Sequence, residues 1–366
     1  MENGASYLAM PVPDRADHLW RYTPWHRIHP TGKQDEIPSE VTPALVSLSF
    51  LDGSELPAGV SISGIDNSIE RKIGSDIAAS FIRTLSPEGG IKITIDEGLV
   101  LEQPLLLTIE SSGSVSAIQI EVFVGANSQS ELVTLIERGA DWFGLLRHVN
   151  IDDAAIFNDV LVNSLESCQL LRIEQFALKR DAQVKVGTVG SGGLQTKGDL
   201  RYYLEGRGAN LHVNGSILSE DKQHNDHHVE IMHEEPETFS RLKWHSTCDG
   251  KSKTIGTGML RIAQGAKGSD SAQVFNNLLL SKDAEADSIP ELEVLENEVV
   301  GCGHGTASGP VDDEQLFYLQ TRGFSQSGAH GVLIAAFLNA TLKEMGSEAI
   351  HNWLNELVSG GNYSQT

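Results

Sequence analysis

A cysteine and a histidine lie two residues apart in the glycine-rich stretch 299–305. Successive residues of an extended strand point to opposite faces, so Cys302 and His304 are expected on one face, roughly 6.5 Å apart along the backbone. A thiol and an imidazole together suit zinc, copper(I) or an iron–sulfur species better than magnesium or calcium. Two ligands do not complete a tetrahedral site, so the others would come from elsewhere in the fold or from a second subunit. The alternative is a buried cysteine beside a structural histidine.

The histidine-rich stretch 224–233 is a second candidate metal site. On a strand, His228 and Glu230 share one face, whereas His233 lies on the other. His228 and Glu230 could hold one metal ion, as in a cupin-like enzyme, if a neighbouring strand supplied another histidine. The candidates for that third ligand are His212 and His245. The alternative is that these histidines make structural hydrogen bonds.

The composition excludes several classes of partner. The 366 residues include 27 Lys and Arg against 50 Asp and Glu, a formal net charge of −23. Nucleic acid and anionic lipid both attract positive charge, so we expect neither as a partner. No stretch reaches the roughly 18 apolar residues of a membrane span, and we expect no signal peptide. Three widely separated cysteines, Cys168, Cys248 and Cys302, favour free thiols in the cytoplasm.

The elements that must position these residues change along the chain. Residues 1–89 predict a mixed arm, with a short helix near 15–21, a strand at 44–50 and a helix-like pattern at 69–85. From about residue 90 to 309, short β-branched runs recur between turns rich in Gly, Asn, Asp and Ser. This rhythm predicts a mainly β core and leaves a sandwich, a barrel or a solenoid open.

Residues 310–366 predict a helical region. Asp312 suits the N-cap of a helix that Gly323 ends, a second helix begins at Ser325 or Ser327, and a third at Ser347. Helices at the end of a β core would cover an open edge and offer faces to a partner. The chain has no phosphate-binding loop, so we expect no ATPase activity from it. It also lacks the Gly-x-Ser-x-Gly motif of a serine nucleophile.

Four ordered blocks of sequence stand out along the chain. They are Trp-Arg-Tyr-Thr at 20–23, Asp-His-His-Val-Glu-Ile-Met-His at 226–233, the segment 276–294 from Asn-Asn-Leu-Leu-Leu onward, and Cys-Gly-His-Gly-Thr at 302–306 with Asp-Asp-Glu-Gln-Leu-Phe-Tyr-Leu at 312–319. These blocks resemble the SufB/SufD family, the scaffold subunits of the SUF iron–sulfur cluster assembly system, and the match is dense from about residue 226 to 338. Gly303 follows the cysteine where the SufB branch usually carries glutamate, so the resemblance is strongest to SufD.

The resemblance implies a right-handed parallel β-helix with helical segments at both ends. It implies a non-enzymatic scaffold that pairs with a SufB-type subunit, where a transient iron–sulfur cluster forms at the interface with His304 and Cys302. It further implies that a SufC-type ABC ATPase docks on the C-terminal helices. The docking residues would include Leu316, Phe317, Tyr318, Arg322 and Phe337. A self-pairing homodimer and a cupin-like metal enzyme stay open as alternatives, and so does the use of a flavin.

Overall fold

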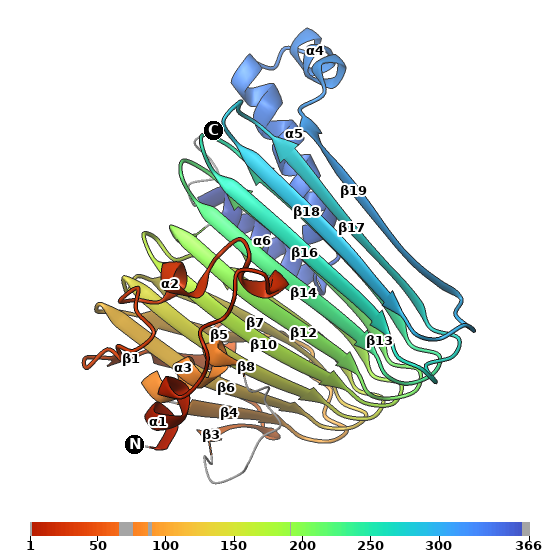
Figure 1. Cartoon of the computed structure of the whole chain (residues 1–366). Helices are drawn as coiled ribbons and strands as arrows, with labels where there is room; N and C mark the ends of the chain where they lie inside the picture. Colours follow the sequence, from red (N-terminus) through yellow and green to blue (C-terminus); the bar gives the residue numbers. More distant parts are fainter. Residues whose placement is uncertain (1, 66–75, 87–89, 191, 361–366) are drawn as a thin grey trace.

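The computed structural model describes residues 2–65, 76–86, 90–190 and 192–360, and most of them form a β-solenoid of about eight turns (Figure 1). Each turn adds one strand to each of two sheets, and all neighbours are parallel except the pairs β2–β5 and β3–β4. The first sheet contains β1 (Thr42–Pro43), β3 (Val60–Gly64), β4 (Gly90–Ile95), β6 (Val115–Val124), β8 (Trp142–Ile151), β10 (Gln169–Leu178), β12 (Gln195–Leu204), β14 (His224–His233), β16 (Lys253–Ile262) and β18 (Glu285–Val294). The second contains β2 (Leu45–Phe50), β5 (Leu105–Ser111), β7 (Gln129–Arg138), β9 (Ile156–Asn163), β11 (Gln183–Gly190), β13 (Asn210–Ser219), β15 (Phe239–Cys248), β17 (Asp270–Leu279) and β19 (Gly301–Pro310).

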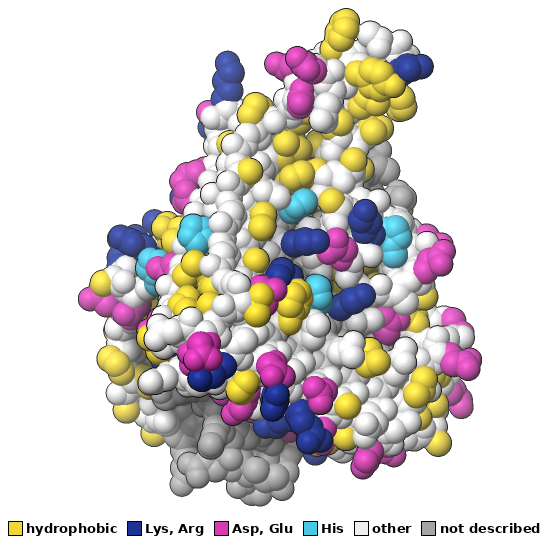
Figure 2. Space-filling model, turned by 90° about the vertical axis from the view of Figure 1, so that its right-hand side faces the viewer, with side chains coloured by type: hydrophobic (Ala, Val, Ile, Leu, Met, Phe, Trp, Pro, Cys, Tyr) yellow, Lys and Arg dark blue, Asp and Glu magenta, His cyan; other side chains and the backbone are white. Residues whose placement is uncertain are grey.

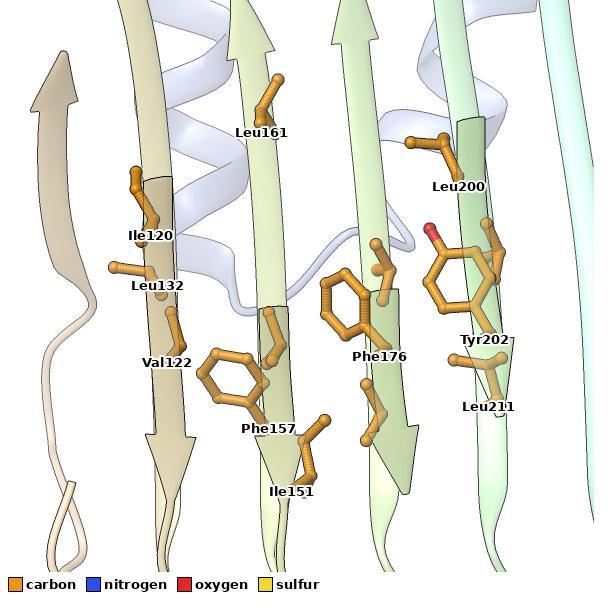
Figure 3. Packing of buried hydrophobic residues seen from close by; sticks show 14 of the residues in the cluster. Ile120, Val122, Leu132, Ile151, Phe157, Leu161, Phe176, Leu200, Tyr202 and Leu211 are labelled. Atoms are coloured by element: carbon orange, nitrogen blue, oxygen red, sulfur yellow. The ribbon is translucent and has the colours of Figure 1, made fainter. Parts of the chain in front are cut away.

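The interior between the two sheets is filled by the alternate, inward-facing residues of each strand. Phe157, Phe176 and Tyr202 lie on successive turns and are fully buried, with the rings of Phe176 and Tyr202 5.1 Å apart (Figure 3). Stacking each turn on the next buries a continuous apolar column that no single turn could bury alone. Alternate residues of each strand therefore form the apolar inner surface of the solenoid.

The turns that lead from the first sheet to the second also stack on one another. Each has one residue in the left-handed backbone region, whose N–H donates to a carbonyl oxygen of the following turn: Asn127 bonds to Asp153, and Asp181 to Arg207. Glycine and asparagine adopt this conformation readily, which explains why such residues separate the strands. The full series is Gly98, Asn127, Ala154, Asp181, Gly208, Glu237 and Gly268.

Helices cover the outer faces of both sheets, since parallel sheets are normally buried on both sides. On the first sheet, α1 (Glu2–Leu8), the 3₁₀ turn His18–Trp20, α2 (Trp25–Ile28) and α3 (Ile77–Leu85) pack through Trp25 and Phe81 against Trp142. On the second, α5 (Gln326–Leu342) packs mainly on β13 and β15, while its last residue, Leu342, and α6 (Glu348–Gly360) belong to an apolar cluster with β7, β9 and β11. The remaining helix, α4 (Asp313–Thr321), projects beyond the last turn (Figure 1).

The predicted mainly β solenoid with helices at its ends is confirmed. Asp312 and Ser325 are the N-caps of α4 and α5, each accepting hydrogen bonds from backbone N–H groups of the first turn. The helix-like pattern at 69–85 corresponds to α3, and its first part lies outside the described residues. The helix predicted near 15–21 is only the short 3₁₀ turn. None of the described helices is long and apolar enough to cross a membrane.

Candidate functional site

Strand β19 positions Cys302 and His304 on the inward face of the last turn, so the two side chains do share a face. Their Cα partners on β17 are Ser271 and Gln273, both buried in the interior. Further along β19, the hydroxyl of Ser308 accepts a hydrogen bond of 2.9 Å from Asn277 on β17. β19 is therefore tied to the preceding turn by a side-chain hydrogen bond as well as by its backbone pairing.

Asn277 also connects the two sheets across the interior. Asn277 Nδ2 also donates to Ser288 Oγ on β18 at 2.8 Å. One amide group thus links β17, β18 and β19, the three strands nearest the open end. The end of the solenoid is held in shape although no further turn covers it in the described part of the chain.

The two candidate ligands differ in exposure because they lie at this open end. Cys302 is half-buried against the interior cluster, and burial raises the pKa of its thiol. His304 is exposed. In the described residues neither side chain has a hydrogen bond or an ion pair, and no strand pairs with the free edges of β18 and β19. Both groups can therefore meet a ligand or another chain.

The outward face of β19 is unusually bare. A Cβ atom added at Gly303 or Gly309 would meet no atom within 4 Å, and one at Gly305 would only reach Val274 at 4.0 Å. Packing within this chain therefore does not require these glycines. A bare strand beside an unpaired edge allows another surface to approach the backbone closely.

The residues of the histidine-rich stretch are not brought together. His233 faces the interior, where its ring is hydrogen-bonded to Thr238 at 2.7 Å and Ser240 at 2.8 Å. His228 and Glu230 lie on the outer face of the first sheet, and burial lowers the pKa of His228 to about 4. Glu230 lies 3.8 Å from the guanidinium of Arg201.

A third ligand for that stretch is also missing. His212 and His245 belong to β13 and β15 of the second sheet, so the interior separates them from His228. Within the described ranges, no three His, Cys, Asp or Glu side chains form a group that could hold a metal ion. The geometry therefore gives the cupin-like alternative no complete ligand set.

The predicted docking residues fall into two groups. On α4, Phe317 is 68% and Tyr318 56% exposed, Leu316 is half-buried, and the guanidinium of Arg322 lies 5.2 Å from the Tyr318 ring centre. Phe337 on α5 instead faces the solenoid, where its ring stacks on His245 at 4.4 Å and its carbonyl oxygen lies 2.8 Å from His245 Nδ1.

An exposed apolar surface is therefore concentrated on α4 and the residues that follow it. We call it the α4 surface; Figure 2 shows hydrophobic side chains gathered at the top of the molecule, at the height of α4 in Figure 1. Its exposed large side chains are Phe317, Tyr318, Phe324 and Val332. Contiguous exposed apolar side chains of this kind mark interaction sites.

Sequence reasoning did not single out Ser271 and Gln273, the β17 residues that adjoin the candidate pair, and it included Asn277 only in the Asn-Asn-Leu-Leu-Leu block. Each is an ordinary polar residue in a strand, and only the stacking of β17 on β19 makes it a neighbour of Cys302, His304 or Ser308. The signal that could have found them is the inward alternation of both strands, once their register is known.

Comparisons with known proteins agree with this architecture. The family described as "SUF system FeS cluster assembly, SufBD core domain" matches residues 93–337. An iron-sulfur cluster assembly SufBD family protein of Mycobacterium tuberculosis is 24% identical, over 96% of this chain and 89% of the relative. One of Mycobacterium leprae is 24% identical, over 92% and 87%. The iron-sulfur cluster assembly protein SufD of Escherichia coli is 25% identical, over 89% and 84%.

The family match covers most of the β-solenoid and continues into α5, and the relatives are matched along most of their own length. The strand that bears Cys302 and His304 lies within the matched region. This chain therefore belongs to the SufBD family of iron–sulfur cluster assembly proteins.

Proposed function

We propose that this chain is a SufD-like scaffold subunit that pairs with a SufB-type subunit and docks a SufC-type ABC ATPase. The observation that carries the proposal is the position of β19, which presents a thiol and an imidazole at the unpaired end of the solenoid. The free edges of β18 and β19 have N–H and C=O groups that a second chain can pair with. The SufB-type subunit would approach there and contribute the remaining ligands.

The cargo at this interface would be a nascent iron–sulfur cluster rather than a resident cofactor. Cys302 and His304 offer a soft sulfur and a nitrogen donor, which suit iron bound to sulfide. Two donors hold such a cluster weakly, which fits a scaffold that passes it on. The chain would have no turnover of its own, and its free thiols suit the reducing cytoplasm.

The ATPase would bind at α4, the helix that follows the last strand of the solenoid. The α4 surface is apolar and exposed, and α4 follows β19 directly in the chain, so movement of α4 would be transmitted to the strand that bears the ligands. In this scheme ATP hydrolysis by the partner shifts the interface between the two scaffold subunits. The energy source and the cluster site are then on different chains.

Replacing His304 tests the cluster site. His304→Ala removes an exposed donor without disturbing the interior, so cluster assembly by the complex with its SufB-type and SufC-type partners should be lost while the complex itself persists. Cluster formation is measured by visible absorption after supply of iron and sulfide, and the complex by its mass in solution. Thr306→Ala, on the same face of β19 but without a metal-binding group, is the matched control. Normal assembly by the His304 variant would eliminate this site.

Replacing the exposed rings of α4 tests the docking surface. Phe317→Ser with Tyr318→Ser removes apolar area that is already exposed, so the fold should be unaffected while binding of the SufC-type ATPase weakens at least tenfold, as expected for aromatic residues central to an interface. Affinity is measured by calorimetry, with Gln320→Ser on the same helix as control. Equal affinity for all three proteins would place the ATPase elsewhere.

The state of assembly separates the heterodimer from a self-paired scaffold. Mass in solution should correspond to a monomer for this chain alone and to a heterodimer after addition of the SufB-type subunit. A stable dimer of this chain that excludes the SufB-type subunit would instead favour self-pairing through the same free edges.

A further inference from the structure

Gln273 is a buried glutamine whose side-chain oxygen has no partner. Its side chain extends across the interior from β17 to the first sheet, where Nε2 donates to the carbonyl oxygen of Glu291 at 2.9 Å and to that of Gly258 at 3.4 Å. Both amide hydrogens are thereby used. The carbonyl oxygen, Oε1, is buried and accepts no hydrogen bond from any residue that the structure describes.

The orientation of this amide is determined by its surroundings. Exchanging its oxygen and nitrogen would place Oε1 against two carbonyl oxygens and break both hydrogen bonds. Oε1 lies over the bare backbone of Gly258, where an added Cβ would be only 1.9 Å away. A buried acceptor without a donor costs about 1–3 kcal/mol, so a site that leaves one unpaired is expected to meet a donor in its working state.

The neighbour of Gln273 on β19 is His304, whose imidazole has an N–H to donate. Gln273 and His304 are Cα partners on adjacent strands and both face the interior. Parallel neighbours lie about 4.8 Å apart at the backbone, so a His304 imidazole rotated inward would lie over the Gln273 side chain. His304 itself has no hydrogen bond in the described structure, so it is free to make this one.

A second acceptor on β17 is the hydroxyl of Ser271, the Cα partner of Cys302. The direction of its hydrogen follows from a chain of hydrogen bonds that includes His233. His233 Nδ1 lies 2.7 Å from Thr238 Oγ1, and Thr238 is 3.1 Å from the carbonyl oxygen of Glu235. Thr238 also lies 2.8 Å from Ser269 Oγ, whose own hydrogen goes to the carbonyl oxygen of Ala266. The arrangement that satisfies both carbonyl oxygens has Thr238 donating to Glu235 and Ser269 donating to Ala266, so that His233 Nδ1–H donates to Thr238.

This assignment sets the direction of the remaining hydrogen bonds. Because Nδ1 bears the hydrogen, His233 Nε2 accepts from Ser240 Oγ at 2.8 Å, and Ser240 accepts from Ser271 Oγ at 2.7 Å. Ser271 has thus donated its only hydrogen, and its remaining lone pairs can only accept. Cys302, the Cα partner of Ser271 on β19, has an S–H group to donate.

We propose that Gln273 and Ser271 are positioning residues for the candidate pair, Gln273 Oε1 accepting a ring N–H of His304 and Ser271 Oγ accepting the S–H of Cys302. The first bond selects one tautomer of His304 and leaves its other nitrogen available at the open end. Histidines that bind metals normally donate their second N–H to such an acceptor. This inference rests on the proposed function for the identity of the cargo, but not for the two hydrogen bonds.

The first test uses the full metal-free chain and needs no partner. Nitrogen-15 NMR of the histidine rings, with His304 assigned from a His304→Asn variant, should show a single tautomer in the wild type and a mixture of both tautomers in Gln273→Met. Gln119→Met is the matched control, because Gln119 is another buried glutamine, hydrogen-bonded to Ser86 far from β19. An unchanged tautomer in Gln273→Met overturns the role of Gln273.

The thiol is tested by infrared spectroscopy of the same metal-free protein. The S–H stretching band of Cys302, identified by its loss in Cys302→Ser, should move to higher frequency in Ser271→Ala, because its acceptor is removed. Thr306→Ala, which removes another hydroxyl on the same face of β19, should leave the band unchanged. A band that does not respond to Ser271→Ala overturns the role of Ser271.

Cobalt(II) binding to the complex with the SufB-type subunit separates the two proposals. Loss of Gln273 should weaken cobalt binding about 10–100-fold if the ligand is His304. If binding depends on His304 and Cys302 but not on Gln273, the inference fails and the proposed function stands. If His304→Ala and Cys302→Ala bind cobalt like the wild type, the proposed function fails, while the NMR and infrared results still decide the hydrogen bonds.

Discussion

Four charged side chains inside the solenoid neutralise one another. Arg147 Nη1 lies 2.9 Å from Asp159 and 3.3 Å from Glu174, and Arg172 Nη2 lies 2.9 Å from Glu174. All four are fully buried. Burial alone would raise the pKa of Glu174, but the guanidinium groups of Arg172 and Arg147 outweigh it and lower that pKa. Such a network does little for stability while complete, and is costly when one member is removed.

Removing one charge from this network should destabilise the fold strongly. Arg147→Met leaves Asp159 without its main partner in the interior, and the free energy of unfolding should fall by about 3–5 kcal/mol. Urea denaturation followed by circular dichroism measures the change. The control is Arg207→Ala, which breaks an exposed pair with Glu237 and should cost less than about 1 kcal/mol. Similar midpoints for the two variants would show that the buried network is dispensable.

At the scale of the strand, glycines have two different roles in the solenoid. Gly215 on β13 makes room for the indole of Trp244 on β15, its neighbour in the interior, because an added Cβ would lie 2.2 Å from the ring. Gly303 on β19 has no such neighbour. The first glycine is required by packing within the chain, whereas the second leaves a surface open.

The two positions should therefore respond differently to the same substitution. Gly215→Ala forces Trp244 to move and should lower stability by about 1–3 kcal/mol, the usual range for overpacking. Gly303→Ala should leave the stability of the isolated chain within about 0.5 kcal/mol. Thermal unfolding of both variants is the measurement. A loss at Gly303 as large as that at Gly215 would mean that β19 is packed more tightly than its exposed face indicates.

For the molecule as a whole, several histidines are held neutral by burial. Burial, followed by the charges of Arg172 and Lys197, lowers the pKa of His227 to about 3. Burial also lowers the pKa values of His228 and His233 to about 4. In the unfolded chain these rings would titrate near pH 6.5. At pH values between the pKa of a buried histidine in the folded chain and its pKa in the unfolded chain, the unfolded chain binds more protons than the folded one. The free energy of unfolding therefore falls as pH decreases.

We therefore expect a loss of stability from about pH 6.5 down to about pH 4. Each unit by which a histidine pKa is lowered contributes about 1.4 kcal/mol to this loss. Urea midpoints at a series of pH values measure it, and His233→Gln should reduce the loss because it removes one titrating group. His26→Gln, at an exposed position, is the control. Identical pH profiles for the His233 variant and the wild type would contradict this origin.

The sequence by itself determined much of the architecture, because its signals are local. Alternation of apolar residues and the turn residues between strands predicted a β core. Asp312 predicted where one helix begins, and a second start was narrowed to Ser325 or Ser327, of which Ser325 is the N-cap. The spacing of Cys302 and His304 was sufficient to predict that they share a face, since side-chain alternation along a strand is independent of the fold. The choice of a solenoid came from resemblance to a family, because a sandwich or a barrel has the same local rhythm.

Only the tertiary structure decided which residues meet between turns. The register of β17 against β19 places Gln273 beside His304 and Ser271 beside Cys302, and a shift of one residue would have turned them to the other face. The structure likewise placed His212 and His245 on the second sheet, away from His228, and turned Phe337 toward His245. These contacts join strands far apart in sequence, and their register depends on the summed packing of the whole interior, which no local pattern records.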